Sequence, residues 1–323
     1  MDIKLYTLAE EFAKVGGAYL LLGEIHKCKD FALDLKTIYD FYSNMKVVFT
    51  GSCATSIYNS QADLSCRAVL YHMNGLSYRE FLELKLDKKL PVFTLDEICE
   101  NSIELIDGLQ NKFIPLEHFS EYLKYGYYPF YFSDKDNYHK QLSAVVNLTI
   151  DVDLVMLGYI KPAFANKLKK LLNVICCSKP FELNITKVAA NIEVSRNTIY
   201  AYLEHLTKGD LLTVVADNKK GLTVPSKPEK LYLNNTNLSY ALCLEPEIGT
   251  VREGFFNQLQ EQYSLTTTKK GDFIVNDKFT FEIRGEGKSF KQIKDLDNAF
   301  VVQDTDSTEN RHKIPLWLFG FLY

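Results

Sequence analysis

Hydrophobic positions near the start of the chain form two strand-like runs with a helical stripe between them. The two runs are Tyr19–Leu22 and residues 46–50, each short and apolar. Between them, apolar side chains recur at helical spacing, at Phe31, Leu35, Ile38 and Phe41. A strand, a helix and a second strand in this order predict a parallel sheet. We also expect a helix at residues 5–15 and a third strand at residues 68–71.

Polar side chains follow both expected strands at the point where each strand ends. Glu24 comes after the first strand, and Thr50 and Ser52 close the second. Ligands of parallel sheets bind outside the carboxyl ends of the strands. We therefore expect these three residues to lie at a binding site.

Four short motifs follow one another along this part of the chain. They are LGEIHK at residues 22–27, TGSC at 50–53, DLSCRA at 63–68 and GLSYREF at 75–81. In this order they resemble L-D-E-x-H-K, T-G-S-S, D-L-S-R-R-A and G-L-S-F-R-E-F in the second half of an AAA-type P-loop ATPase domain. That domain is typical of a prokaryotic family of ATP-binding proteins, which also carry a winged helix and a C-terminal domain of unknown function.

The resemblance implies ATP and Mg²⁺ as cofactors and a nucleotide as partner. It implies that Glu24 is the Walker B glutamate, which polarises the attacking water in the family. It also implies sensor-like roles for Thr50 and Ser52 and a phosphate-sensing role for Arg67.

Three departures from the family motifs affect this nucleotide site. Gly23 stands where the family has the aspartate that helps to hold Mg²⁺, and Cys66 replaces the first arginine of the R-R pair. No G-x-x-x-x-G-K-[ST] occurs in the 323 residues, so the usual phosphate cradle is missing. We therefore expect an N-terminally truncated chain that lacks the Walker A segment and has little or no ATP turnover. In the alternative interpretation, Glu24 and His26 only cap the following helix and face solvent.

Composition and charge narrow the classes of protein that remain. With 46% hydrophobic and 24% charged residues, the chain is typical of a globular protein with room for two or three domains. A formal net charge of −4 provides no overall basic field, so nucleic-acid binding would need a local patch. No apolar run approaches the ~20 residues of a membrane helix, and the N-terminus lacks the apolar core of a signal peptide. We expect a cytoplasmic protein with no membrane partner.

The cysteines predict neither disulfides nor zinc. There are seven, an odd number, and none of them forms a C-x-x-C pair. The adjacent Cys176 and Cys177 have neither zinc-ligand spacing nor nearby histidines. We predict reduced thiols throughout.

Residues 76–165 have mostly helical periodicity, and in the family this region forms a helical lid over the nucleotide. Ser77 with Glu80 gives the pattern of a capping box, and a second helix begins after Thr94. Residues 122–132 are rich in aromatic side chains but hold one lysine and no arginine. That composition favours buried packing over a base-stacking platform.

Residues 166–233 show the order helix, helix, turn, helix and β-hairpin, which is typical of a winged helix. Ser195 would cap the third helix, and the hairpin strands are expected at residues 211–215 and Lys230–Leu233. This order predicts a module that is used either for DNA binding or only for protein packing.

A DNA-binding module would place specific side chains on the duplex. At the exposed start of the recognition helix these are Arg196, Asn197 and Tyr200, where base edges are usually read. Lys219 and Lys220, in the expected turn of the wing, would contact phosphates.

Residues 234–323 are expected to form a C-terminal α/β domain that resembles the restriction-endonuclease-like core. Its candidate residues follow the order helix, strand and strand, as Glu253, Asp272 and Glu282. In that core two carboxylates hold Mg²⁺ and a lysine orients water. Arg284 occupies the position of this lysine and stays protonated, although Lys288 could reach in from the following turn.

Taken together, the patterns predict an α/β multidomain protein with four parts. They are a partial AAA-type P-loop parallel sheet at 1–75, a helical lid at 76–165, a winged helix at 166–233 and a nuclease-like domain at 234–323. The function expected is that of an AAA-family ATP-binding protein impaired in hydrolysis. The alternatives are a winged-helix DNA-binding protein and, with less support, a Mg²⁺-dependent nuclease.

Overall fold

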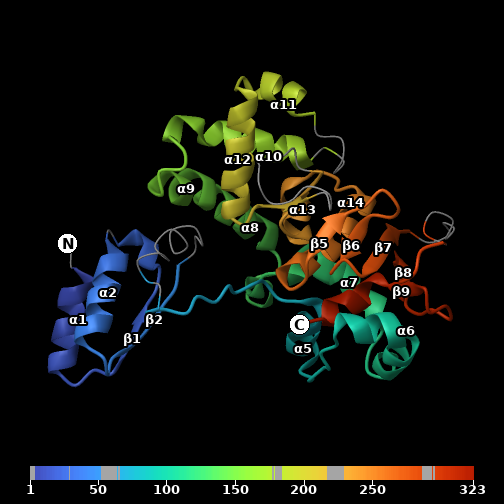
Figure 1. Ribbon diagram of the computed structural model, residues 1–323, viewed down its shortest axis with the longest axis horizontal. Coiled ribbons are helices and arrows are strands. Elements are labelled where there is room, and N and C mark those ends of the chain that lie inside the picture. The colour runs from blue at the N-terminus through green and yellow to red at the C-terminus, as the bar shows by residue number, and fades with distance from the viewer. Residues whose placement is uncertain are drawn as a thin grey trace. The chain divides into compact units, whose positions relative to one another are not determined.

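The computed structural model describes residues 4–28, 30–51, 64, 66–176, 178, 184–216, 229–285, 293 and 295–323 (Figure 1). The chain forms two compact units. The first comprises residues 1–73 together with 151–160, and the second comprises residues 74–150 and 161–323.

The first unit is built on the expected strand, helix and strand. Helix α1 (Leu5–Lys14) precedes strand β1 (Tyr19–Leu22), the 3₁₀ turn η1 (Ile25–Lys27), helix α2 (Phe31–Phe41) and strand β2 (Lys46–Phe49). Strands β1 and β2 pair in parallel, with Tyr19 opposite Lys46 and Leu22 opposite Phe49. These two strands and their connecting helix therefore confirm the parallel arrangement expected from the sequence.

The core of this unit lies between the helices and one face of the β1–β2 pair. Leu20 on β1 packs in one buried cluster with Leu5 of α1 and with Leu35 and Ile38 of α2. The opposite face carries apolar side chains that stay exposed, since Leu21 is 76% and Val48 is 58% accessible. The alternation along β1 thus separates a packed face from an open one.

The expected third strand at residues 68–71 is not formed. These residues adopt no regular element, and Val69 and Tyr71 are 76% and 85% exposed. An apolar run becomes a strand only where a neighbouring backbone takes up its N–H and C=O groups. In the described part of the first unit, the backbone pairing of the sheet ends with β1 and β2.

The second unit begins with helices whose starts were predicted from their caps. Helix α5 (Tyr78–Leu86) opens with a capping box between Ser77 and Glu80, and α6 (Leu95–Gln110) opens with one between Thr94 and Glu97. Helix α7 (Pro115–Glu121) continues into the π-helical turn η2 (Tyr122–Gly126) and is followed by the 3₁₀ turn η3 (Pro129–Phe132).

The rest of this helical region continues into both units. Helix α8 (Tyr138–Leu148) leads into the π-helical turn η4 (Thr149–Asp153) and the short helix α9 (Leu154–Met156). Residues 151–160, which include the end of η4 and all of α9, are part of the first unit. Part of the aromatic stretch is buried, with Tyr122, Tyr127 and Tyr131 each at most 8% exposed, whereas Phe132 is 42% exposed.

Three helices and a strand pair follow in the order expected for residues 166–233. After the 3₁₀ turn η5 (Pro162–Phe164) come α10 (Ala165–Cys176), α11 (Ile185–Ile192) and α12 (Arg196–Lys208). Strands β3 (Leu212–Val215) and β4 (Lys230–Leu233) pair antiparallel, with Leu212 opposite Leu233.

A five-stranded mixed sheet organises the C-terminal part of the second unit. Helices α13 (Thr236–Leu242) and α14 (Ile248–Asn257) and the 3₁₀ turn η6 (Gln258–Glu261) precede it. The strands are β5 (Leu265–Thr267), β6 (Phe273–Val275), β7 (Phe279–Arg284), β8 (Ala299–Gln303) and β9 (Lys313–Pro315), and the 3₁₀ turn η7 (Leu316–Phe321) follows.

The strand order in this sheet is β5-β6-β7-β8-β9 (Figure 1). The first three strands are antiparallel, while β8 runs parallel to both β7 and β9. Phe256 of α14 packs against Phe273, Phe281 and Phe319, so α14 covers one face of the sheet.

The prediction that all cysteines are reduced is wrong for one pair. Cys176, the last residue of α10, forms a disulfide with Cys243, which follows α13, and their Cα atoms lie 5.5 Å apart. The two residues are 67 positions apart, and only the folded chain brings them together. Cys28, Cys66 and Cys99 are free. Among the described residues, no helix has the length and apolar character needed to cross a membrane.

Candidate functional site

Backbone hydrogen bonds join the carboxyl ends of β1 and β2. The N–H of Thr50 donates to the carbonyl of Leu22 at 2.9 Å, and the N–H of Ile25 donates to the carbonyl of Thr50 at 2.8 Å. Glu24 lies between these bonds in the left-handed region, with φ 52°. The structure thus brings Glu24 and Thr50 together at one edge of the sheet, as the sequence predicts.

The position of the family aspartate is open but carries no carboxylate. A Cβ atom on Gly23 would lie 4.0 Å from the Thr50 hydroxyl, which is ordinary contact. The space around Gly23 therefore accommodates a Cβ atom, and a clash at this position does not explain the glycine.

The charged groups beside Glu24 are already engaged with one another. The Glu24 carboxylate is half-exposed and lies 3.3 Å from the Lys27 ammonium and 3.8 Å from Nε2 of His26. His26 also approaches the carboxylate of Asp153 at 3.9 Å. Burial raises the pKa of Asp153, with His26 opposing this shift and Glu24 adding to it.

In the alternative interpretation, Glu24 and His26 cap the following helix and face solvent. The structure agrees with it only in that Glu24 is exposed. Neither η1 nor α2 has a side-chain cap, and the His26 side chain is only 2% exposed. His26 is therefore a buried polar group next to Asp153.

Arg67 is held elsewhere in the first unit. Its guanidinium donates to both oxygens of Asp40, at 3.0 and 3.4 Å. Asp40 lies near the end of α2, which leads from the carboxyl end of β1 to the amino end of β2. The structure accordingly does not join Arg67 to Glu24 and Thr50. Ser52, the other expected sensor residue, lies outside the described residues.

These residues do not fit the Mg²⁺ of a nucleotide site. Among the described residues at this edge, the Glu24 carboxylate already contacts the Lys27 ammonium, and the Asp153 carboxylate lies beside the His26 side chain. Nowhere in the described ranges do three His, Cys, Asp or Glu side chains gather so that they could hold a metal ion. A Mg²⁺ site usually needs carboxylates together with the phosphates of its substrate, and no step of hydrolysis can be assigned here.

The start of α12 carries the expected DNA-contacting side chains. Ser195 accepts a hydrogen bond from the N–H of Thr198 at 3.1 Å and so caps the helix. Arg196 and Asn197, in the first turn, are exposed, and Tyr200 is half-buried. Lys219 and Lys220 lie outside the described residues.

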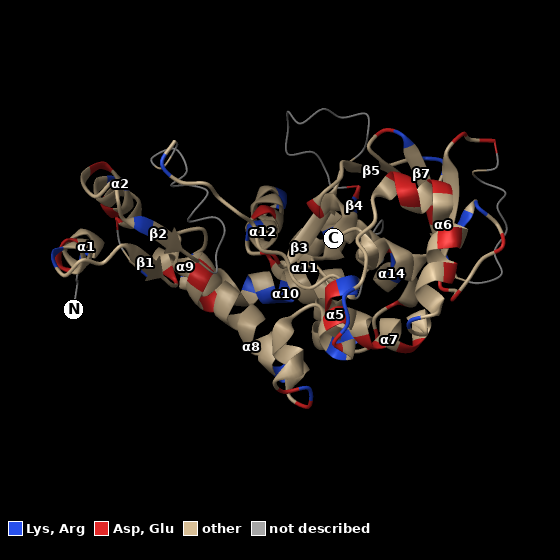
Figure 2. Cartoon of the chain, turned by 90° about the horizontal axis from the view of Figure 1, so that it is seen from below, with Lys and Arg blue, Asp and Glu red and all other residues tan. Residues whose placement is uncertain are grey.

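This region is also basic within an acidic chain. Residues 161–210 contain eight Lys and Arg against four Asp and Glu, whereas the whole chain has a formal charge of −4. Figure 2 shows basic residues along α10. Part of this charge is paired, because Lys208 contacts Glu204 at 2.7 Å. The region therefore has a local basic excess, although the chain as a whole is acidic.

A buried ion cluster joins β4, α14 and the start of β6. The ammonium of Lys230 donates to Oε2 of Glu253 at 2.7 Å and to Oδ1 of Asp272 at 3.2 Å. Tyr232, two residues along β4, donates its hydroxyl proton to the same Oε2 of Glu253. The other oxygen of Asp272 accepts the backbone N–H of Ile283 at 2.8 Å. The structure thus brings two of the three predicted carboxylates together.

The sequence reasoning missed Lys230, although its strand carried a signal. In β4 the polar-ended Lys230 and Tyr232 alternate with Leu231 and Leu233, and all four residues are buried. A lysine and a tyrosine on one face of a buried strand require partners, because a buried charge is costly unless it is paired.

The third predicted carboxylate, Glu282, has a different partner. Its Oε1 accepts a hydrogen bond from Arg284 on the same strand, and Glu282 is only 4% exposed. Lys288 lies outside the described residues. Burial raises the pKa of Glu253, and the nearby Asp272 adds to this, while Lys230 acts in the opposite direction.

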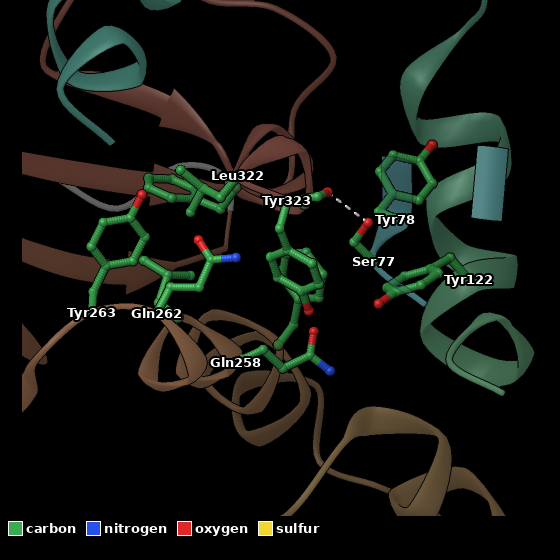
Figure 3. A pocket seen from close by; sticks show the side chains of 12 residues that line it. Ser77, Tyr78, Tyr122, Gln258, Gln262, Tyr263, Leu322 and Tyr323 are labelled. Atoms are coloured by element: carbon green, nitrogen blue, oxygen red, sulfur yellow. Dashed lines mark hydrogen bonds between the residues drawn. The ribbon is translucent and has the colours of Figure 1, made fainter. Parts of the chain in front are cut away.

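A small cavity lies between α5, η2, α14 with η6, and the end of the chain (Figure 3). Its lining includes Tyr78, Tyr122, Gln258 and Tyr323, and the Ser77 hydroxyl donates to the Tyr323 carbonyl at 2.9 Å. Its volume of about 10 Å³ is close to the minimum that one water needs. The cavity is too small to be a substrate site.

Comparison with known protein families gives two matches. Residues 2–82 match the model of an AAA domain, and residues 116–247 match that of a domain of unknown function (DUF8612). The first match contains α1, β1, α2 and β2 and ends within α5, and the second extends from α7 to the loop before α14. No curated protein and no solved structure matches the chain. The AAA match supports an AAA-type domain at the start of the chain.

Proposed function

We propose that this chain is of AAA-type ATPase lineage and that, as this polypeptide, it does not turn over ATP at a useful rate. The observation that carries the proposal is the arrangement of Glu24 and Thr50 at the carboxyl ends of β1 and β2. Backbone hydrogen bonds join these strand ends, and Glu24, to which we assign the Walker B position, pairs its carboxylate with Lys27. The family match over residues 2–82 supports the lineage.

The chemistry of ATP hydrolysis explains the inactivity. Phosphoryl transfer depends on positioning the phosphates and on neutralising their charge with Mg²⁺, backbone amides and a lysine. The sequence lacks the P-loop motif, Gly23 offers no metal ligand, and Arg67 is engaged by Asp40. Glu24 alone can polarise a water but can neither bind nor orient the nucleotide.

Thermal unfolding with and without ATP and Mg²⁺ tests this proposal, together with a turnover assay. We expect no shift in Tm at millimolar ATP in the wild type, in Glu24→Gln or in Gly23→Asp, which restores the family carboxylate. A ligand that binds only the folded state must raise Tm. A rise of several degrees, or turnover above background that Glu24→Gln removes, would contradict the proposal.

A second function, duplex DNA binding by residues 165–233, is favoured by a different observation. The three helices and the β3–β4 pair have the element order of a winged helix, with α12 as the recognition helix. Its first turn exposes Arg196 and Asn197 to solvent, and the surrounding fifty residues carry a basic excess. A helix of this kind reads base edges from its N-terminal residues.

Fluorescence anisotropy with a labelled duplex, measured across a salt series, tests this function. We expect binding that weakens steeply between 50 and 200 mM salt. Lys187 is an exposed lysine of α11 within this basic region, so Lys187→Ala should make the salt slope shallower by about one unit if it removes a phosphate contact. Arg196→Ala should weaken binding about tenfold or more if it contacts a base. The matched control is Lys89→Ala, because Lys89 is an exposed lysine outside this module. Binding that ignores salt, or that Arg196→Ala and Lys89→Ala change equally, would exclude this surface.

The nuclease alternative has less support. The helix α14 precedes the strands β5 to β8, which is the order of elements expected from the sequence for a nuclease-like core. The carboxylates that should hold Mg²⁺, however, already bind Lys230 and Arg284. We therefore propose no cleavage reaction for this domain.

A further inference from the structure

Lys230 is a fully buried lysine whose charge is satisfied by acidic groups from two other elements. Its exposed fraction is 0%, and its ammonium reaches Glu253 on α14 and Asp272 before β6. The ring of Phe273 lies 4.4 Å from the same ammonium. A desolvated ammonium is tolerated when carboxylates and an aromatic face replace its water.

The same two carboxylates are those that the nuclease-like pattern assigned to a divalent cation. We propose that Lys230 is the resident cation of the Glu253–Asp272 pair, so that its ammonium occupies the place of a metal ion and makes this centre structural. The centre then fastens strand β4 to α14 and to the edge of β6. This inference is independent of the functions proposed above.

Charge explains why the ammonium and a metal exclude each other at this centre. The Lys230 ammonium repels any cation placed beside it, and it repels a divalent ion twice as strongly as a monovalent ion at the same distance. Each carboxylate also accepts a second hydrogen bond. Tyr232 donates to Glu253, and the N–H of Ile283 donates to Asp272. Glu282, which a metal centre would need as a further ligand, is bound to Arg284.

The first test is a Mn²⁺ titration of the wild-type protein, followed by electron paramagnetic resonance of the free ion. We expect no stoichiometric binding up to 1 mM. Binding of one Mn²⁺ per chain that Asp272→Asn abolishes would overturn the proposal, because the carboxylates would then hold a metal despite the lysine. The expected result is measured on the wild-type protein, so it does not depend on whether a variant folds.

The second test compares Lys230→Met with Lys278→Met. Lys278 also pairs with a carboxylate, Asp96, but its side chain is 49% exposed. We expect Lys230→Met to lower Tm by about 10 °C, because two partly buried carboxylates lose their counter-charge, and Lys278→Met to lower it by about 2 °C or less. Equal effects would overturn the proposal.

A compensating variant keeps the proposal testable if Lys230→Met does not fold. In Lys230→Met/Glu253→Gln the counter-charge and one carboxylate are removed together, so we expect recovery of at least half of the lost Tm. In Lys230→Ala, which leaves room beside the carboxylates, millimolar Mn²⁺ should raise Tm while leaving the wild type unchanged. No recovery in the double variant, or no Mn²⁺ effect on Lys230→Ala, would overturn the placement of the ammonium at a cation position.

Discussion

Cys176 at the end of α10 and Cys243 after α13 are joined by a disulfide that closes a segment containing α11, α12, β3, β4 and α13. The bond ties the basic helical region to the helix that leads into the C-terminal sheet. A cross-link of this kind stabilises mainly by restricting the unfolded chain, and the effect grows with the length of the closed loop.

The disulfide leads to a prediction about oxidation and stability. Cys176→Ser should lower the free energy of unfolding by about 2–4 kcal/mol under oxidising conditions, the range typical of disulfides in proteins. Urea denaturation with and without reductant measures this, and reductant should make wild type and variant alike. Cys66→Ser is the matched control, because Cys66 is free and exposed. Alkylation of Cys243 in the folded, unreduced wild type would contradict the bond.

Asn237 gives a second prediction, since its amide satisfies four buried groups. Its Oδ1 accepts the N–H of Tyr127 at 2.9 Å and the hydroxyl of Tyr138, and its Nδ2 donates to the carbonyls of Tyr122 and Leu123 at 3.0 and 2.9 Å. These carbonyls belong to the π-helical turn η2, where the regular helical bonding is interrupted.

Replacing this amide should be costly, because buried partners would lose their hydrogen bonds. Asn237→Ala should lower the free energy of unfolding by about 3–4 kcal/mol, whereas Tyr138→Phe, which removes one bond, should cost about 1 kcal/mol. Asn147→Ala, on the exposed side of α8, serves as control. Equal effects of Asn237→Ala and Asn147→Ala in urea denaturation would refute the role of the amide.

The pKa of Glu121 gives a third prediction. Burial alone raises the pKa of this carboxyl, but hydrogen bonds from Lys135, Lys85 and Tyr131 outweigh it and hold the pKa at about 2. The unfolded value is ~4.3. Because the folded pKa is the lower one, the ionised carboxylate contributes stability above pH ~4.3 that is lost as the pH falls toward 2.

Glu121→Gln should remove this dependence on pH. At pH 6 the variant should be less stable than wild type by about 1–2 kcal/mol, a value reduced for partial exposure, and the difference should shrink below pH 4. Urea midpoints at pH 3 and pH 6 measure it. Glu117→Gln, at an exposed position of the same helix, controls for the loss of any carboxylate. A difference that stays constant between the two pH values would argue against the shift.

The sequence predicted elements whose cause is local. Helix α2 begins and ends where the apolar stripe does, and the caps Ser77, Thr94 and Ser195 mark the starts of α5, α6 and α12. The adjacency of Glu24 and Thr50 followed from the rule that parallel strands present their carboxyl ends at one edge. The strand predicted at residues 68–71 was wrong, because an apolar run forms a strand only where a neighbouring strand pairs with its backbone.

Features that depend on distant contacts could not be read from the sequence. The disulfide joins residues 67 positions apart, and Arg67 meets Asp40 rather than the strand ends. The three-residue strands β5 and β9 are too short for a period to be visible. The Glu253–Asp272 pair was expected from the order of elements, but its cation is a lysine from β4, which no motif would have placed there.

Ser195 allows a final prediction that separates folding from DNA binding. Its hydroxyl caps α12 immediately before Arg196 and Asn197. Ser195→Ala removes the cap and should cost about 1 kcal/mol in the free energy of unfolding. Ser195→Asp keeps a capping oxygen and adds a negative charge at the positive end of the helix, so its stability should equal or exceed that of the wild type.

The negative charge of Ser195→Asp would face the phosphates of a bound duplex and should weaken binding several-fold, most strongly at low salt. Urea denaturation and anisotropy on the same three proteins measure both properties. If Ser195→Asp binds DNA as tightly as the wild type across the salt series, the start of α12 is not the surface that contacts DNA.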